Sequence, residues 1–418
     1  MDISDIEERL RHVDRGVRAR ALDEAMAACS AGGVTCAPPR EVANLHCHTV
    51  FSYNAYGHTP TSLAWLARKE GWYALATVDF DVLDGVQETL EACDRAGVRG
   101  ASGLETRTYL AEFGDHEINS PGEPGVCYLV GMGHVAQPEA QEVKDALARM
   151  KRCAQERNRD LVTRVNAHLT PVAIDYDRDV LPLTPSGTAT ERHILVAYDA
   201  KARRQFPDRE ALLAFWADRL GVTAAEADTA IGDEPAPSDL VRARLMKQGG
   251  VGYVQPGPTT FPPLDDVTGA IVAAGAMPIY PWLDGSTGGE ARIEELLELL
   301  IAKGVAAITI IPERNWHIAD PTQRVARVAA LHAVIDLARR LDLPILIGTE
   351  MNKPGQPLLD AWDAEALRPH RDEFLRGAAW IYGHSLLQRA LGMGYQSAWA
   401  RAHLPERDAR NAFFVRVG

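Results

Sequence analysis

The sequence has 418 residues, of which 46% are hydrophobic, 24% charged and 7% aromatic. This mixture is that of an ordinary globular protein and excludes a disordered, collagen-like or disulfide-scaffold chain. Lys and Arg number 44 against 57 Asp and Glu, a formal net charge of −13. We therefore expect neither a nucleic acid nor an anionic membrane as partner, although a single cleft can still be positive where basic side chains gather.

The six cysteines include no Cys-x-x-Cys pair, which argues against a zinc knuckle and against a disulfide framework. The N-terminus, MDISDIEERLRHVDRG, is acidic where a signal peptide would be basic and then apolar. No apolar run reaches membrane-spanning length. We expect a cytoplasmic protein and leave its oligomeric state open.

Residues 1–40 are predicted to form an N-terminal helical segment, because Ile6, Leu10, Val13 and Val17 recur at helical spacing. From residue 42 onward, short apolar runs alternate with helices. Thr59 is the expected N-cap of a helix and Pro60 its first residue. The helix is predicted to end at residue 69, and Gly71 follows as a stop signal. Strands are predicted at 73–78 and 98–104, with a helix between them that ends before residue 97.

The same alternation returns in the second half of the chain, with apolar runs at 277–280, 305–311 and 344–347 that each follow a predicted helix. Such alternation is typical of a parallel sheet or barrel. Residues 135–260 differ, because they show helical patterns and little strand signal beyond 162–165. The predicted organisation is thus a first barrel part at 41–134, a mostly helical insertion at 135–260, and a second barrel part with C-terminal helices at 261–418.

Polar side chains follow the predicted strands. In a parallel α/β fold these positions share one face of the protein. His-x-His on a strand projects both imidazoles to the same side, and carboxylates from other strand ends can complete the shell of a divalent ion. The polar residues at these strand ends are His46, His48, Asp79, Asp81, Glu105, Arg107, Tyr280, Glu313, Arg314, Glu350 and Asn352.

These residues carry a family resemblance. NLHCHTVFSYNAYGHTP, then ATVDFDVLDGVQE and GLETRT, resemble the opening motifs of the PHP (polymerase and histidinol phosphatase) superfamily, which read H-x-H, T-D-H and G-x-E. TATERHILVAY is similar to a helix of the family's insertion, and LPILIGTEMN takes the place of its G-S-D-x-H segment. The resemblance spans about residues 42 to 355. It implies a distorted TIM-like (β/α)7 barrel with a helical insertion, preceded here by the N-terminal helix.

The resemblance also implies a metal site at the C-terminal mouth of the barrel, with His46, His48, Glu105 and Glu350 as ligands. Phe80, Tyr128 and Tyr280 stand where the family has histidines, so we predict one ion rather than two or three. Imidazole and carboxylate ligands accept Zn, Mn or Fe. A second site could be rebuilt from four further residues, of which His116 is the best placed: Asp79, His58, His116 and His134.

The predicted function is metal-dependent hydrolysis, most simply of a phosphoester in a small anionic metabolite. Asp79 would orient or deprotonate water, and His116 and Tyr280 are further catalytic candidates. The predicted substrate-binding residues are Arg107, Arg192, His193, Trp282, Arg314, Asn352 and Lys353. Two alternatives stay open. One is an isomerase or lyase of a sugar or sugar acid that uses the same metal, and the other is a non-catalytic relative that only binds a ligand.

Overall fold

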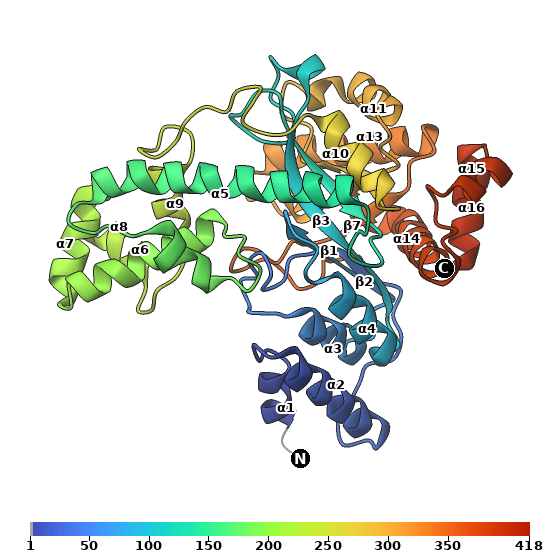
Figure 1. Cartoon of the computed structure of the whole chain (residues 1–418), viewed down its shortest axis with the longest axis horizontal. Coiled ribbons are helices and arrows are strands. Elements are labelled where there is room, and N and C mark those ends of the chain that lie inside the picture. Colours follow the sequence, from blue (N-terminus) through green and yellow to red (C-terminus); the bar gives the residue numbers. More distant parts are fainter. Residues whose placement is uncertain (1–2) are drawn as a thin grey trace.

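A seven-stranded sheet forms the centre of the protein (Figure 1), in a computed structural model that describes residues 3–418. Its spatial order follows the chain order from β1 to β7. The strands are β1 Ala43–Cys47, β2 Ala74–Phe80, β3 Arg99–Tyr109, β4 Val126–Met132, β5 Met277–Trp282, β6 Ala307–Ile310 and β7 Ile345–Ile347.

The sheet curls until its two edge strands meet. A parallel bridge joins Cys47 to Glu350, just beyond β7. The Glu350 N–H donates to the His46 carbonyl at 2.7 Å, and the His48 N–H donates to the Glu350 carbonyl at 2.9 Å. Neighbouring strands are parallel except β4, which runs antiparallel to β3 and β5. No crossover helix separates β3 from β4, as a parallel connection would need. The predicted α/β barrel class is confirmed.

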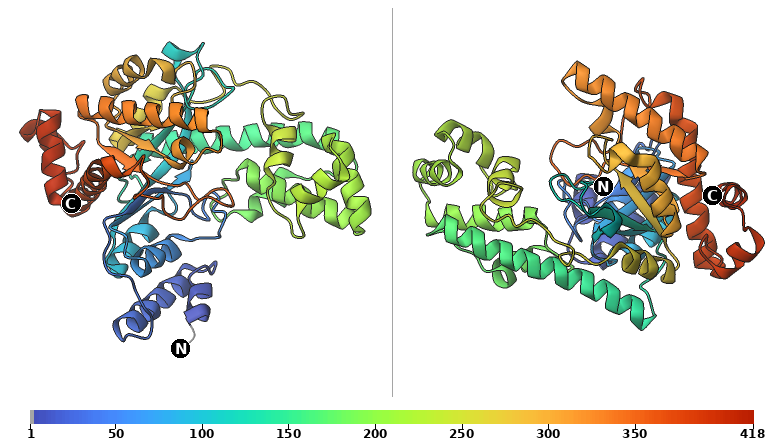
Figure 2. Two further views of the ribbon diagram at one scale, coloured as in Figure 1. Left: turned by 180° about the vertical axis from the view of Figure 1, so that it is seen from behind. Right: turned by 90° about the horizontal axis from the view of Figure 1, so that it is seen from above.

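Helices cover the outside of the barrel (Figure 2), and most begin and end where the sequence predicts. Thr59 caps α3 through a capping box with Ser62, and Gly97 ends α4 in the left-handed conformation at φ 68°. These helices are α3 Pro60–Lys69, α4 Val86–Ala96, α10 Leu264–Ala273, α11 Ile293–Ala302, α12 Glu313–Trp316, α13 Pro321–Arg340 and α14 Arg371–Leu391.

The insertion forms a helical lobe beside the barrel, and the long helix α5 connects the two (Figure 1). Its helices are α5 Gln141–Leu169, α6 Glu191–Gln205, α7 Arg209–Leu220, α8 Ala224–Ile231 and α9 Asp239–Met246. The lobe has a hydrophobic cluster of its own, in which Tyr198 and Trp216 are fully buried. The strand expected at 162–165 is wrong. Val162 and Val165 belong to an apolar stripe of α5, where their helical spacing points both into this cluster.

The N-terminal segment contains two helices, α1 Ile3–Arg9 and α2 Arg15–Ser30, instead of one. Asp14 starts the second helix by accepting a hydrogen bond from the Val17 N–H at 2.9 Å. Val13, expected on the packing face, is 92% exposed because it lies in the break. Cys29 and Cys36 are joined by a disulfide that closes the loop after α2. This local bridge was not expected from the cysteine pattern.

Two short helices follow α14 at the C-terminal end, α15 Ala398–His403 and α16 Arg407–Val417. The second of them packs against α14, on the opposite side of the barrel from the insertion (Figure 1). Within residues 3–418, no helix combines the length and the apolar character needed to cross a membrane.

Candidate metal centre

Three predicted ligands meet at the mouth of the barrel. His46 lies in β1, His48 follows that strand, and Glu105 lies in β3, two strands away. Glu105 Oε2 is 3.5 Å from His46 Nε2 and 3.3 Å from His48 Nε2. All three side chains are buried, and they form the one group of metal-ligating side chains found between residues 3 and 418.

The imidazole nitrogens of this triad suit a bound ion. Apart from the contacts of the two Nε2 atoms with Glu105, both ring nitrogens of His46 and the Nε2 atom of His48 are buried without a hydrogen-bond partner among the described residues. Buried polar atoms normally have hydrogen-bond partners, so such a cluster of imidazole nitrogens is typical of a ligand site. Two imidazoles and one carboxylate fit Zn, Mn or Fe.

A hydrogen-bonded chain holds His48 in place from behind. Its Nδ1 atom lies 3.3 Å from Ser52 Oγ, which donates to Asp79 Oδ1 at 2.7 Å. Asp79 also accepts hydrogen bonds from the Thr49 N–H and the Thr49 hydroxyl, both at 2.7 Å. These donors occupy the Asp79 carboxylate, which is 2% exposed and does not line the cavity. The structure therefore places Asp79 where it orients His48 through Ser52.

Charge and stacking also act on the triad. Burial opposes ionisation of Glu105, but His46 and His48 lower the pKa of its carboxyl far below the usual range. Burial likewise opposes protonation of His48, yet the Glu105 carboxylate raises its pKa. Phe80 stacks on the His48 ring with centroids 4.4 Å apart. The Glu105 carboxylate is therefore ionised, as a metal ligand must be. Phe80 shields one face of the His48 ring from water.

Glu350, the fourth predicted ligand, lies beside the triad but outside it. Both of its carboxylate oxygens are bonded to Arg314 Nη2, at 2.8 and 2.9 Å. Gln356 Nε2 donates to it at 3.2 Å and Asn352 Nδ2 at 3.4 Å. Burial opposes ionisation of Glu350, but Arg314 lowers the pKa of its carboxyl. Its negative charge is therefore already paired within the protein.

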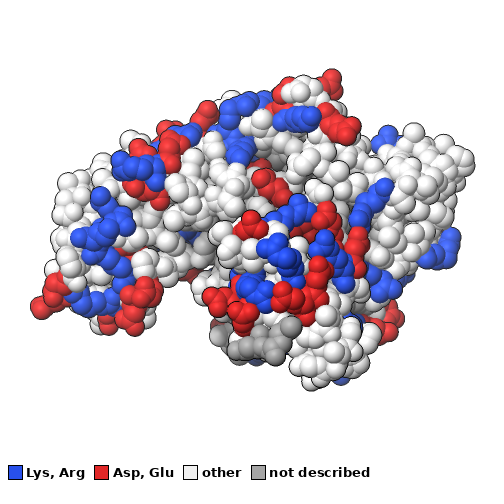
Figure 3. Space-filling view, turned by 60° about the horizontal axis from the view of Figure 1, so that its bottom comes forward, with Lys and Arg blue, Asp and Glu red and all other residues white. Residues whose placement is uncertain are grey.

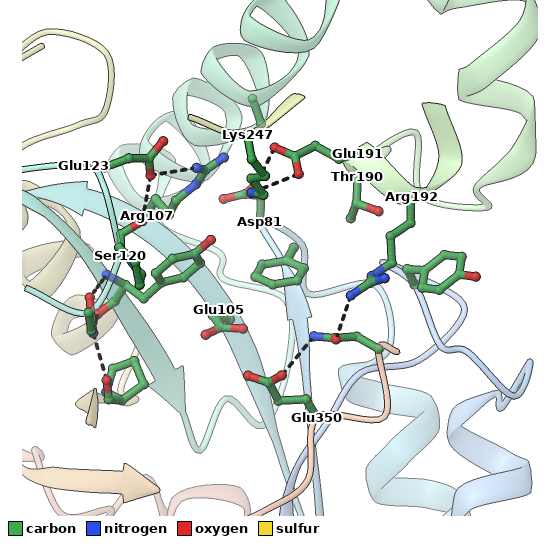
Figure 4. A pocket seen from close by; sticks show the side chains of 18 of the residues that line it. Asp81, Glu105, Arg107, Ser120, Glu123, Thr190, Glu191, Arg192, Lys247 and Glu350 are labelled. Carbon is green, nitrogen blue, oxygen red and sulfur yellow. Dashed lines mark hydrogen bonds and ion pairs between the residues drawn. The ribbon is translucent and has the colours of Figure 1, made fainter. Parts of the chain in front are cut away.

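A cavity of about 600 Å³ lies between the barrel mouth and the insertion. Figure 4 shows Glu105 and Glu350 on the barrel side and Glu191, Arg192 and Lys247 reaching in from the insertion side. Aromatic side chains complete the wall on the barrel side: Tyr53, Phe80, Tyr128 and Trp282. The size is that of a small-molecule site.

The cavity contains more basic than acidic side chains. Glu191 is shared by Arg242 at 2.7 Å and Lys247 at 3.0 Å. Arg157, on α5, has no carboxylate within ion-pair distance among residues 3–418, and its guanidinium lies 4.9 Å from the centre of the Phe261 ring. Burial and the neighbouring Arg107 lower the pKa of Arg157 to about 10, so it stays charged at neutral pH. Six Lys and Arg side chains and five carboxylates line the cavity, and most of these cations are paired. Arg157 is the cation that leaves positive charge available to an anionic ligand.

Five of the seven predicted substrate-binding residues line this cavity: Arg107, Arg192, Trp282, Arg314 and Asn352. The other two do not line the cavity. His193 Nδ1 accepts a hydrogen bond from the Thr190 N–H at 3.1 Å, and Lys353 Nζ lies 2.8 Å from Asp239. Both are occupied in the protein itself.

Two predicted catalytic residues lie away from the cavity. Tyr280 is fully buried, and its hydroxyl donates to Glu290 Oε1 at 2.8 Å. Pro281 and Trp282 line the cavity, whereas the Tyr280 side chain points away from it towards Glu290. His116 is partly exposed, with Nε2 2.8 Å from Arg292 Nη1.

The residues considered for a second metal site do not come together. His58 Nδ1 lies 3.0 Å from Ser62 Oγ at the start of α3, and His134 lies beside Gly131 and His384. No second group of ligating side chains is found within residues 3–418.

Four charged residues of the insertion were missed as site residues: Arg157, Glu191, Arg242 and Lys247. Glu191 precedes the predicted Arg192, so its segment was identified although the residue was not. The other three belong to strongly charged stretches in which no local signal distinguishes them from solvent-exposed residues.

Two buried histidines make the stability of the protein sensitive to acid. Burial lowers the pKa of His134 to about 3 and that of His384 to about 4. Both are neutral in the folded protein but titrate near 6.5 once unfolded. The contribution of these neutral histidines to the free energy of unfolding is therefore fully present above pH 6.5. It falls as the pH drops towards 4, by up to about 1.4 kcal/mol per pH unit for each residue.

Urea unfolding of chelator-treated protein between pH 7 and 5 measures this fall. His134→Phe, which cannot be protonated, is expected to lose up to about 1.4 kcal/mol less per pH unit than the wild type. An unchanged slope in the variant would show that His134 does not contribute to the acid sensitivity.

The sequence matches no protein-family model. It has no significant match among curated proteins. Among solved structures it is similar to an amidohydrolase from Chromobacterium violaceum with bound sulfate and no metal, at TM-score 0.49 and 20% identity, covering 79% of this chain and 96% of the other. It is also similar to a proposed metal-dependent phosphoesterase from Bifidobacterium adolescentis, at TM-score 0.48 and 20% identity, covering 81% and 98%.

Proposed function

We propose that the protein is a metal-dependent hydrolase of the PHP type that cleaves a phosphoester bond in a small anionic metabolite. The observation that supports the proposal is the buried triad of His46, His48 and Glu105, at the base of a cavity where Arg157 has no carboxylate partner within residues 3–418. The resemblance of the sequence motifs supports the PHP type. The size of the cavity and its basic side chains support a small anionic substrate.

The triad residues would hold the ion, and Ser52 and Asp79 would fix the orientation of His48. A divalent ion bound there supplies Lewis acidity towards a phosphoryl oxygen and lowers the pKa of water. The chain itself contributes the dry base of the cavity, where Phe80 covers His48. Arg107, Arg157, Arg192 and Lys247 would bind the anionic groups of the substrate.

A small molecule is the partner that fits these features best. The cavity of about 600 Å³ has the size of a metabolite site. On the face drawn in Figure 3, Lys and Arg are interspersed with Asp and Glu and form no continuous basic surface. This distribution supports a small anionic substrate over a nucleic acid or an anionic membrane.

Isotope labelling tests the reaction. Protein loaded with Zn, Mn or Fe is incubated in 18-O water with a panel of phosphomonoesters and phosphodiesters, and the products are analysed by mass spectrometry. We expect turnover with one 18-O atom in the phosphate product, and no turnover with chelator-treated protein.

Two other outcomes would contradict hydrolysis. Turnover of a sugar phosphate without 18-O uptake would identify an isomerase or lyase. Binding of phosphorylated ligands without turnover, with every metal tested, would leave a ligand-binding protein as the remaining interpretation.

A further inference from the structure

Arg314 is held at the cavity by only part of its guanidinium group. Its Nη2 atom contacts both oxygens of Glu350, at 2.8 and 2.9 Å. Its Nε and Nη1 atoms make no hydrogen bond or ion pair to another residue of the described chain, 3–418. The side chain is 41% exposed and lines the cavity. Arg314 therefore has free N–H donors at the place where a substrate would lie.

The carboxylate that holds Arg314 is itself fixed to the metal-binding strand. Glu350 lies in the left-handed backbone region, at φ 64°. Its backbone is bonded on one side to His46 and on the other to His48. The Glu350 carboxylate raises the pKa of Arg314, and Glu105 adds to this shift. The guanidinium charge is thus held in place beside the triad through Glu350.

Within residues 3–418, no second group of ligating side chains is found that would hold another metal ion beside the triad. Asp79 accepts three hydrogen bonds, and Glu350 is paired with Arg314. Phosphoryl transfer depends on neutralising the charge on the equatorial phosphoryl oxygens, with ions or with Arg and Lys. Arg314 has the charge, the free donors and the position to do so.

We propose that Arg314 is the second cationic group of a one-metal centre and donates hydrogen bonds to the non-bridging oxygens of the substrate phosphate. In this assignment Glu350 is a positioning residue that holds Arg314, rather than the fourth metal ligand. The assignment rests on the proposed function for its substrate class. It explains how a site with a single group of ligands can offer a phosphate N–H donors in addition to one ion.

The test combines metal analysis with phosphate binding, so it does not depend on turnover. Metal per chain is measured by inductively coupled plasma mass spectrometry, and the affinity of the metal-loaded protein for inorganic phosphate by titration calorimetry. The variants are Arg314→Met, Arg314→Lys and Glu350→Gln. Arg389→Met is the matched control, because Arg389 forms a two-bond pair with Asp94 on the surface, at 2.7 and 3.2 Å.

We expect all four variants to keep the metal content of the wild type. Arg314→Met should weaken phosphate binding at least about tenfold, because a charge-assisted hydrogen bond is lost. Arg314→Lys, which keeps the charge but not the fork of donors, should lie between Arg314→Met and the wild type. Glu350→Gln should weaken phosphate binding by loosening Arg314, and Arg389→Met should match the wild type.

Three results would overturn the assignment. Arg314→Met and Arg314→Lys could both bind phosphate as tightly as the wild type. Glu350→Gln could lose the metal while Arg314→Met keeps it, which would make Glu350 a ligand. Metal could also be lost from both Arg314 variants, which would make Arg314 a support of the metal site. If the wild type binds phosphate but hydrolyses no phosphoester, the proposed function fails while these titrations still decide the role of Arg314.

Discussion

Replacing His48 by alanine or Glu105 by glutamine is expected to remove bound metal and catalytic turnover together. Each change deletes one of the three side chains that form the one ligating group among residues 3–418. We expect metal content to fall from about one equivalent to near zero, and kcat to fall by at least about a thousandfold. Metal per chain and initial rates on the best substrate of the phosphoester panel measure the two effects.

A surface pair provides the matched control. His317 Nδ1 lies 3.2 Å from Glu313 Oε1, and the His317 side chain is 69% exposed. His317→Ala also removes a histidine beside a carboxylate, yet metal content and activity should not change. Ser52→Ala should give an intermediate result, about a tenfold to hundredfold weaker affinity for the metal, because His48 loses its orienting partner. A His48→Ala protein that keeps its metal and full activity would rule out the triad as the metal site.

The triad could be predicted because its geometry follows from local rules. His46 and His48 share a face through the two-residue period of a strand, and Glu105 ends up opposite them because parallel strands end at the same rim. The helix starts were equally local, since Thr59 and Pro60 define the first turn of α3 through their own bonding. Features that depend on two or three consecutive residues were therefore predictable.

The missed features depend on how distant segments pack. Tyr280 and Pro281 are neighbours in an apolar strand, and only the pairing of β5 with β4 and β6 decides which of them faces the cavity. Arg157 is one of several charges along α5, and its role follows from where the insertion docks. The break between α1 and α2 was missed although its contacts are local: Asp14 caps α2, and the Arg18 side chain donates to the carbonyl oxygens of His12 and Val13.

The seam between β1 and β7 is expected to be sensitive to any added side-chain volume. A methyl group at Gly348 would lie 2.3 Å from His46 Cβ and 2.5 Å from the His46 nitrogen, so the two strands would have to separate. Gly348→Ala should lower the free energy of unfolding by about 2–4 kcal/mol, because the clash is with backbone rather than with a movable side chain. It should also weaken metal binding, since His46 moves with the strand.

Urea unfolding and metal analysis of the same preparations measure both effects. Gly269→Ala is the matched control, because Gly269 lies on the exposed side of α10 with no atom within 4 Å of the added methyl group. There the substitution should raise stability by about 0.5–1 kcal/mol, as alanine does in a helix interior. A Gly348→Ala protein as stable as the wild type would mean that the seam is looser than its geometry indicates. Loss of stability together with loss of metal would show that the contact closing the barrel also positions His46 for the ion.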